Sequence, residues 1–196
     1  MKSDATIKAI KTQYKGQYYR SRTEARWAVF FDYLQLEFKY EPEGYDLGKD
    51  GWYLPDFYIP SLDCFIEIKP DVPVEGRESP TEALAAHTGK SVYTFYGSPQ
   101  LPIDSFDGGV CICVDCVYKE LSGAMSYGWD DGYHLCVCPS CGRAGIEFDG
   151  RADRIDCDCI KSVHGDKGYN ANDERIVNAA KRAMNEFRSS RRKAAQ

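Results

Sequence analysis

The sequence predicts an α/β fold, and three observations carry that prediction. Apolar residues recur at helical spacing over residues 21–36, where no glycine or proline interrupts. Short aromatic and β-branched runs separated by Gly- and Pro-containing turns then predict strands at 37–41, 52–59 and 64–69. A short helix at 81–88 precedes a further strand at 91–96. The predicted order through residue 96 is therefore helix, three strands, helix and strand.

The first predicted helix has a clear start. Ser21 followed three residues later by Glu24 matches a capping box, in which the two side chains satisfy free N–H groups at a helix N-terminus. Residues 1–20 are polar and basic, and they predict a weak helix at best.

The second half of the chain differs in composition. An acidic, Gly-rich segment at 104–109 suggests a boundary, cysteines gather between 110 and 160, and residues 172–188 show helical periodicity before a basic tail. We therefore expect three parts: a core at 1–103, a cysteine-rich module at 104–168, and a C-terminal helix with its tail at 169–196.

Composition narrows the class of protein. Of 196 residues, 43% are apolar, which is enough for a packed core. The net charge is −5, but basic residues prevail at both ends and acidic ones between them. An acidic middle suits cation binding and basic ends suit phosphates, although a solvated surface explains the same pattern.

The N-terminus lacks an apolar stretch, and no apolar run is long enough to span a membrane, so we expect an intracellular (cytoplasmic) protein without a membrane partner. Thiols stay reduced in that compartment. The nine cysteines therefore indicate metal binding rather than disulfides.

Charged residues recur along the strand at 64–69. Side chains alternate between the two faces of a strand, so Glu67 and Lys69 share one face while Ile66 and Ile68 face the core. The turn at 60–63 allows this strand to form a hairpin with the preceding one.

That hairpin would bring Asp56 beside Glu67, with the Lys69 ammonium close by. Two negatively charged carboxylates side by side repel each other unless a cation lies nearby. Magnesium takes oxygen ligands, and hydrolysis of a phosphodiester needs such a metal near the scissile phosphate.

This pattern resembles the signature of PD-(D/E)XK nucleases: Asp56 after a proline, then Glu67 and Lys69 in one strand, all following a helix that carries Glu24. The spacing is similar to that of phage Holliday-junction-resolving, transposon-end and very-short-patch-type endonucleases. The resemblance covers about residues 20–97. It implies a restriction-endonuclease-like core: a helix, a three-stranded antiparallel hairpin sheet, a helix and a strand.

The resemblance also implies roles. Asp56 and Glu67 would bind Mg²⁺ or Mn²⁺, together with the carbonyl of Ile68. Lys69 would orient or deprotonate the attacking water, and Glu24 would complete the site, directly or through water.

The implied activity is that of a Mg²⁺-dependent endonuclease on DNA, with RNA left open. Arg22 and Arg26 lie near Glu24 and are expected to contact the substrate backbone. Resolvase-like relatives act as dimers, so a homodimer is one expected arrangement. The small size and layout resemble phage or mobile-element proteins.

Each residue has a plainer interpretation. Glu24 could only cap its helix, Asp56 could be a turn residue, and Glu67 with Lys69 could lie on a solvated strand face. The four together, in this order of elements, favour the nuclease. His87 is assigned no role.

Cys138-x-x-Cys141 resembles a zinc knuckle, and Cys157-x-Cys159 follows sixteen residues after Cys141. Four thiolates from such a pair of motifs suit tetrahedral Zn²⁺, and Gly142 suits the tight turn of the knuckle. The sequence thus predicts a zinc ribbon.

The ribbon is locally basic. Arg143, with Arg151 and Arg154, predicts contact with nucleic acid. Cys64 is predicted to be a small core residue.

The remaining cysteines are ambiguous. Cys111, Cys113 and Cys116 could form a second zinc site with Cys136 or His134, or could be reduced, partly buried thiols. A Cys-His catalytic pair is a weaker interpretation because no third orienting group is evident. The alternative to a nuclease is a non-catalytic zinc-ribbon module that binds nucleic acid or protein on a nuclease-like scaffold.

Overall fold

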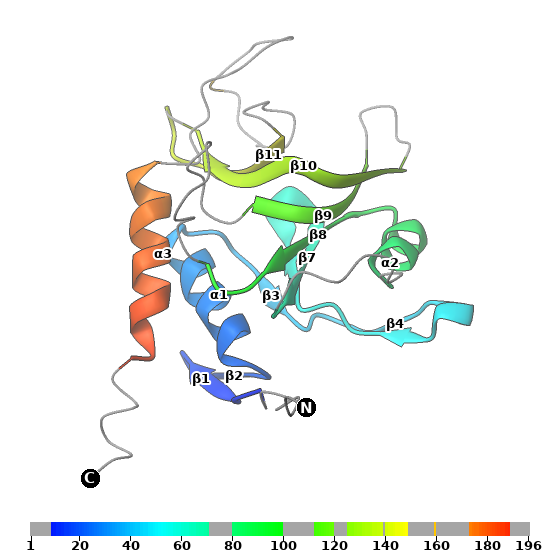
Figure 1. Ribbon diagram of the computed structural model, residues 1–196, viewed down its shortest axis with the longest axis horizontal. Helices are drawn as coiled ribbons and strands as arrows, with labels where there is room; N and C mark the ends of the chain where they lie inside the picture. Colours follow the sequence, from blue (N-terminus) through cyan, green and yellow to red (C-terminus); the bar gives the residue numbers. More distant parts are fainter. Residues whose placement is uncertain are drawn as a thin grey trace, which may run out of the picture.

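The computed structural model is a mixed α/β protein, with a seven-stranded sheet and helices on both of its faces (Figure 1). It describes residues 9–70, 80–99, 112–119, 125–138, 140–148, 159 and 173–188. In 112–119, 125–134 and 147–148 it describes the backbone alone. The α/β class predicted from the sequence is confirmed.

The helices are α1 (Arg22–Tyr33), α2 (Pro80–Thr88) and α3 (Glu174–Glu186). The strands are β1 (Thr12–Tyr14), β2 (Gln17–Tyr19), β3 (Lys39–Tyr40), β4 (Tyr45–Asp46), β5 (Trp52–Tyr53), β6 (Phe57–Ile59), β7 (Cys64–Lys69), β8 (Ser91–Tyr96), β9 (Ile112–Lys119), β10 (Met125–Val137) and β11 (Ala144–Phe148). The large sheet has the order β11-β10-β9-β8-β7-β6-β3. Strands β7 and β8 are parallel and joined through α2, whereas the other neighbours are antiparallel.

The hairpin that the sequence predicted is formed by β6 and β7. Phe57 pairs with Ile66, and Ile59 pairs with Cys64 across a short 3₁₀ turn at 60–62. Asp63 closes this turn with a left-handed φ of 46°. The hairpin therefore fixes which residues of the two strands lie opposite each other.

The two faces of the sheet have separate cores. Helices α1 and α3 pack side by side on one face (Figure 1), where Trp27, Phe30 and Phe31 meet Ile66 and Ile68. Both isoleucines are thus in the core, as predicted. On the other face lies a second cluster of buried residues from the β4–β5 region, the sheet and α2. Its members are Leu47, Phe65, Leu84, Ala85 and Val92.

The prediction of a weak helix at best was wrong for residues 12–19, which form the β1–β2 hairpin. Its two-residue turn, Lys15 and Gly16, has φ angles of 46° and 84°. Positive φ at both central residues gives the turn twist that a hairpin prefers, and glycine adopts it without a steric cost.

Two predicted elements were too long. The run at 52–59 is not one strand: β5 pairs with β4, while β6 pairs with β7 and β3. Between β5 and β6, the Asp56 carbonyl accepts a hydrogen bond from Glu41 N at 2.8 Å, outside regular strand pairing. The first helix ends at Tyr33 rather than at residue 36, because Gln35 turns left-handed with φ 55°.

The sheet continues across the boundary predicted near residue 104, since β8 pairs with β9. The boundary segment itself lies outside the described residues. The division into parts at 1–103, 104–168 and 169–196 stays a prediction.

Candidate functional site

Glu24, Asp56 and Glu67 are the buried charged side chains of the described residues, with exposed fractions of 8%, 2% and 4%. We call these three the carboxylate cluster. A carboxylate is rarely buried unless it is paired, hydrogen-bonded or bound to a metal, because removing its charge from water is costly. Three buried carboxylates from separate elements therefore require an explanation.

Asp56 and Glu67 are held together by the backbone at the open end of the β6–β7 hairpin. Asp56 Oδ2 accepts a hydrogen bond from Ile68 N at 2.8 Å, and Asp56 N donates to Glu67 Oε2 at 3.3 Å. The N–H and C=O of one strand residue point to the same edge. The Ile68 carbonyl therefore also faces the Asp56 edge of β7, which is where the predicted ligand role requires it.

Lys69 directs its ammonium to this pair, since Nζ lies 2.6 Å from Glu67 Oε1. Its side chain is 38% exposed, so the amine lies at the boundary between the cluster and solvent. The Lys69 carbonyl accepts a hydrogen bond from Gly97 N at 2.8 Å, and the Gly97 carbonyl accepts one from Trp27 Nε1 at 2.9 Å. These bonds connect α1 to the end of β7 and fix Lys69 relative to the first helix.

Glu24 caps α1 and also belongs to the cluster, so the two interpretations of this residue are compatible. Its N–H donates to Ser21 Oγ at 3.1 Å, and the Ser21 hydroxyl donates to Glu24 Oε1 at 2.7 Å. The other carboxylate oxygen accepts from the Tyr40 hydroxyl at 2.6 Å. Cap and cluster are thus formed by the same carboxylate.

Arg20, which sequence reasoning missed, lies among the acids. Its Nη2 makes an ion pair with Asp56 Oδ1, its Nε lies 2.8 Å from Glu41 Oε1, and the same Nε is 3.8 Å from Glu24 Oε2. Burial lowers the pKa of Arg20, but the Asp56 and Glu24 charges outweigh it and raise that pKa above its usual value. The i, i+4 spacing of Arg20 and Glu24 in the sequence was a signal for the contact between these two residues.

The electrostatics of the cluster favour a cation. Burial, and then the charges of Glu67 and Glu24, raise the pKa of Asp56 to about 7 against the opposing effects of Ile68 N and Arg20. Burial and the charge of Glu67 also raise the pKa of Tyr53 well above its usual range, which places this phenol near Glu67. Negative charge here exceeds what Arg20 and Lys69 neutralise.

The cluster is an open arrangement. Within the described ranges, the ligand atoms of its three acids do not all lie within 4.8 Å of one another, as those of a closed metal site would. Asp56 and Glu67 form a close pair, and Glu24 reaches them through Arg20. Such a pair fits Mg²⁺, which keeps several waters and needs few protein ligands.

The other residues expected near DNA lie around this end of α1. Arg22 is half-buried at its first position, and Arg26 Nη1 donates to Ser98 Oγ at 3.0 Å. His87, to which no role was assigned, is exposed and packs edge-to-face with Tyr45.

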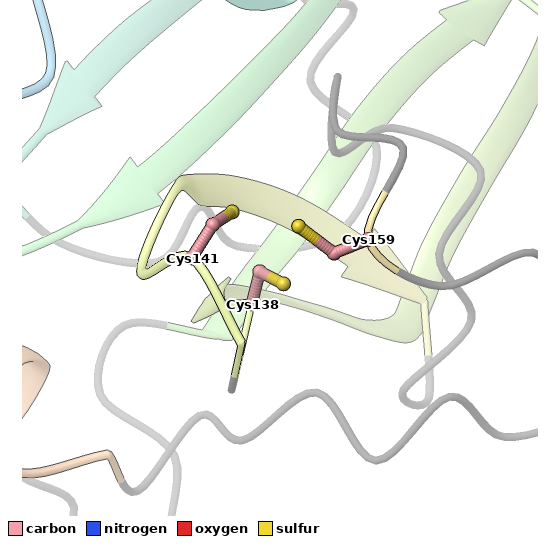
Figure 2. A group of neighbouring side chains, drawn as sticks. All are labelled: Cys138, Cys141 and Cys159. Atoms are coloured by element: carbon pink, nitrogen blue, oxygen red, sulfur yellow. The ribbon is translucent and has the colours of Figure 1, made fainter.

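Three cysteines form a second candidate site. The sulfur atoms of Cys138, Cys141 and Cys159 all lie within 4.8 Å of one another, and Figure 2 shows their side chains converging. Cys138 is buried, whereas Cys141 and Cys159 are exposed. Cysteine sulfurs this close to one another fit Zn²⁺, so these residues could hold such a metal. Cys157, the fourth predicted ligand, lies outside the described residues.

The turn between β10 and β11 shapes this cysteine group. Gly142 N donates to the Cys138 carbonyl at 2.8 Å, and Cys138 N donates to the Arg143 carbonyl at 2.9 Å. Gly142 has a φ of 76°, a conformation that L side chains rarely adopt. Glycine thus allows the close return of the chain that brings Cys141 back to Cys138. Arg143, expected to contact nucleic acid, is exposed on this turn.

Arg175 of α3 lies against the same turn. A β-carbon added to Gly142 would come within 2.0 Å of Arg175 Nη1, so the guanidinium fills the space beside the glycine. Asp173 binds this guanidinium at 2.7 and 2.8 Å and is the main cause of its raised pKa, to which Cys138 and Cys141 also contribute. The Arg175 guanidinium therefore lies beside the sulfurs of the cysteine group.

The second predicted cysteine site stays a prediction. Cys111 lies outside the described residues, and only the backbone is described at Cys113, Cys116 and His134. Cys136 is buried, with its sulfur 3.7 Å from the Gly145 carbonyl.

Cys64 is buried in the core, as predicted. No helix in the described part of the chain is long and apolar enough to cross a membrane.

No protein-family model matches the sequence, and no curated protein or solved structure is significantly similar to it.

Proposed function

We propose that the protein is a Mg²⁺-dependent endonuclease that hydrolyses phosphodiester bonds in DNA, with a PD-(D/E)XK-type centre. The observation that carries the proposal is the burial of Asp56 and Glu67 side by side at the open end of the β6–β7 hairpin, with the Lys69 ammonium on Glu67. A fold gains nothing in stability from burying two like charges together. Their placement is therefore better explained by a cation that binds between them.

The arrangement of elements supports the same proposal. Within the large sheet, helix α1 is followed by the antiparallel strands β3, β6 and β7, then by α2 and by β8, which is parallel to β7. This is the order that the resemblance to restriction-endonuclease-like cores implies. Strands β4 and β5, between β3 and β6 in the chain, pair with each other. Glu24 lies on α1, Asp56 directly precedes β6, and Glu67 and Lys69 lie on β7, an arrangement that supports the proposal.

Each residue has a distinct role in the proposal. Asp56, Glu67 and the Ile68 carbonyl hold Mg²⁺ (or Mn²⁺), which when bound supplies Lewis-acid stabilisation of the phosphate and a more acidic water. The Lys69 amine, fixed 2.6 Å from Glu67 at the solvent boundary, orients the attacking water and offsets phosphate charge. Glu24 completes the centre from α1.

The cysteine group has a supporting role in the proposal. Cys138, Cys141 and Cys159 bind Zn²⁺ together with Cys157, and the metal stabilises the β10–β11 turn against α3. Arg143 on this turn, and Arg22 and Arg26 at the start of α1, contact the DNA backbone. Two cuts by such a centre would need two copies of the chain.

The test is a cleavage assay on labelled duplex, single-stranded and four-way-junction DNA with Mg²⁺, Mn²⁺ or neither. Lys69→Ala removes the proposed water-orienting amine, and Lys90→Ala is its matched control, because Lys90 pairs with Asp63 at the opposite end of the hairpin. Cleavage should require the divalent cation, disappear in Lys69→Ala and persist in Lys90→Ala. The substrate cut fastest then identifies the preferred DNA structure.

The same assay can also refute the nuclease proposal. If folded, zinc-loaded protein leaves every substrate intact in Mg²⁺ and Mn²⁺, the nuclease proposal fails. A mobility-shift assay on the same DNA then shows whether the chain is instead a nucleic-acid-binding module on a nuclease-like scaffold.

A further inference from the structure

Arg20 has an unusual position for a residue outside the predicted signature. It directly precedes Ser21, the N-cap of α1, and its guanidinium reaches Asp56, Glu41 and Glu24 from outside the cluster. Its side chain is 53% exposed, whereas that of Asp56 is 3% exposed. One end of the guanidinium therefore enters the buried cluster while the rest stays open to solvent.

The ion pair between Arg20 and Asp56 opposes the binding of a cation by Asp56. Asp56 Oδ2 is already bonded to Ile68 N at 2.8 Å, and Oδ1 is occupied by Arg20 Nη2. Each carboxylate oxygen can accept more than one partner, but a divalent cation at Asp56 would lie close to the guanidinium charge and repel it. The cation therefore competes electrostatically with Arg20 for Asp56.

The rest of Arg20 is held independently of Asp56. Its backbone N–H donates to the Tyr40 hydroxyl at 3.0 Å, and that hydroxyl donates to Glu24. Its Nε is 2.8 Å from Glu41 Oε1. Release of Nη2 from Asp56 therefore leaves the arginine beside the centre, with free donors facing solvent.

We propose that Arg20 binds a phosphate group of the substrate: it leaves Asp56 when a divalent cation binds there and then donates to the phosphodiester at the centre. This rests on the proposed nuclease function and adds a substrate-binding residue to it. The planar guanidinium suits two-point binding of phosphate oxygens, which a lysine amine cannot reproduce.

The first measurement is DNA affinity. In single-turnover cleavage with Mg²⁺, the protein concentration at half-maximal rate should rise about tenfold in Arg20→Gln. The slope of log affinity against log salt should become shallower by about 0.9, the value for one phosphate contact. Lys90→Gln, which removes a half-buried cation paired with Asp63 at the far end of the hairpin, should change neither. Arg20→Lys should recover the salt slope but only part of the affinity, because it keeps the charge and loses the fork.

The second measurement is the affinity for Mn²⁺ in the absence of DNA, determined by titration calorimetry. Arg20→Gln should bind Mn²⁺ several-fold more tightly than the wild type, because Asp56 Oδ1 no longer has a competing partner. A purely structural arginine would lower the melting temperature and leave both the salt slope and the Mn²⁺ affinity unchanged. That result would overturn the proposal.

The two proposals fail separately. If the wild type cuts DNA and Arg20→Gln matches it in half-maximal concentration, salt slope and Mn²⁺ affinity, the role of Arg20 is refuted and the nuclease stands. If the wild type cuts no DNA, the substrate stays intact, and fluorescence anisotropy with Mg²⁺ gives the same comparison of affinity and salt slope. Equal values there refute Arg20 as a phosphate ligand as well.

Discussion

The carboxylate cluster and the cysteine group are both candidate metal sites, but the fold prepares them differently. The acids lie on a hairpin and a helix that pack into the core, and they are hydrogen-bonded to Ile68 N, Ser21 and Tyr40. Two of the three cysteines are exposed, and Cys159 is far along the chain from the β10–β11 turn. The first site is organised before a metal binds, whereas we expect the second to be organised by its metal.

The largest expected effect is on cleavage. Asp56→Asn should lower the single-turnover cleavage rate by about a thousandfold or more, because it removes a metal ligand from the centre. The melting temperature in the absence of Mg²⁺ should stay the same or rise, since a buried charge is lost. Glu82→Gln, an exposed acid on α2, is the control and should alter neither. A fall in stability that accounts for the lost activity would contradict an organised site.

Removal of zinc, in contrast, should mainly lower the stability of the fold. Cys138→Ser should release the metal and lower the melting temperature by about 6–12 °C, which corresponds to about 3 kcal/mol in a chain of this size. Zinc content by metal analysis should fall from about one ion per chain in the same variant. An unchanged melting temperature with no zinc would show that the turn needs no metal.

The pH dependence of stability sharpens the comparison. The pKa of Asp56 is about 7 in the fold, above its unfolded value of about 3.9, so the folded state holds a proton that the unfolded state releases. Stability without Mg²⁺ should therefore decrease as pH rises from about 4 to 7, by on the order of a few kcal/mol. Thermal melts across this range should show the slope in the wild type and a much flatter one in Asp56→Asn. Equal pH slopes in the two proteins would show that Asp56 is not the group responsible for this pH dependence.

A smaller effect is expected at the turn. Gly142→Ala should destabilise the protein by about 1–3 kcal/mol and weaken zinc binding, because the backbone is left-handed and the new methyl meets Arg175. Gly16→Ala is the matched control, with a similar φ of 84° and nothing within 4 Å of the added atom. It should show the backbone cost without any change in zinc affinity. If both variants retain zinc equally, the contact with Arg175 is unimportant.

The smallest effect concerns the cation beside the sulfurs. Arg175→Gln should weaken zinc binding by a few-fold, because a positive charge beside the negatively charged metal–thiolate group is lost. Arg182→Gln removes an exposed arginine from the same helix, where it pairs with Glu186, and should leave zinc affinity unchanged. Competition with a chromogenic chelator measures both. Equal affinities would assign Arg175 to packing alone.

The sequence predicted those parts of the site that follow from local pattern. Alternation along β7 placed Glu67 and Lys69 on the face opposite Ile66 and Ile68. The turn at 60–63 set the strand pairing that brings Asp56 to Glu67. Arg20, Tyr40 and Tyr53 were missed, because their approach depends on where β3 and β5 lie relative to α1. Long-range packing of this kind leaves no periodicity in the sequence.

The two errors in the predicted strands have identifiable causes. The β1–β2 hairpin is made of three-residue strands, too short for alternation to outweigh a polar composition, and its Lys15-Gly16 turn was the remaining signal. The break between β5 and β6 arises at Asp56, where hydrogen bonds to Glu41 and Glu67 replace regular pairing. A site residue thus interrupts the strand that its neighbours would otherwise continue.

The packing of α3 on α1 has a consequence for synthesis on the ribosome. Ile176, Ala179, Ala180 and Ala183 are buried in the same core as the aromatic residues of α1, although the two helices are separated by most of the chain. The segment that carries Glu24 is synthesised well before residues 174–186, and the part of its apolar surface that α3 covers stays exposed until those residues emerge. A nascent chain that stops short of α3 therefore exposes that part, and the core is completed only after α3 has been made.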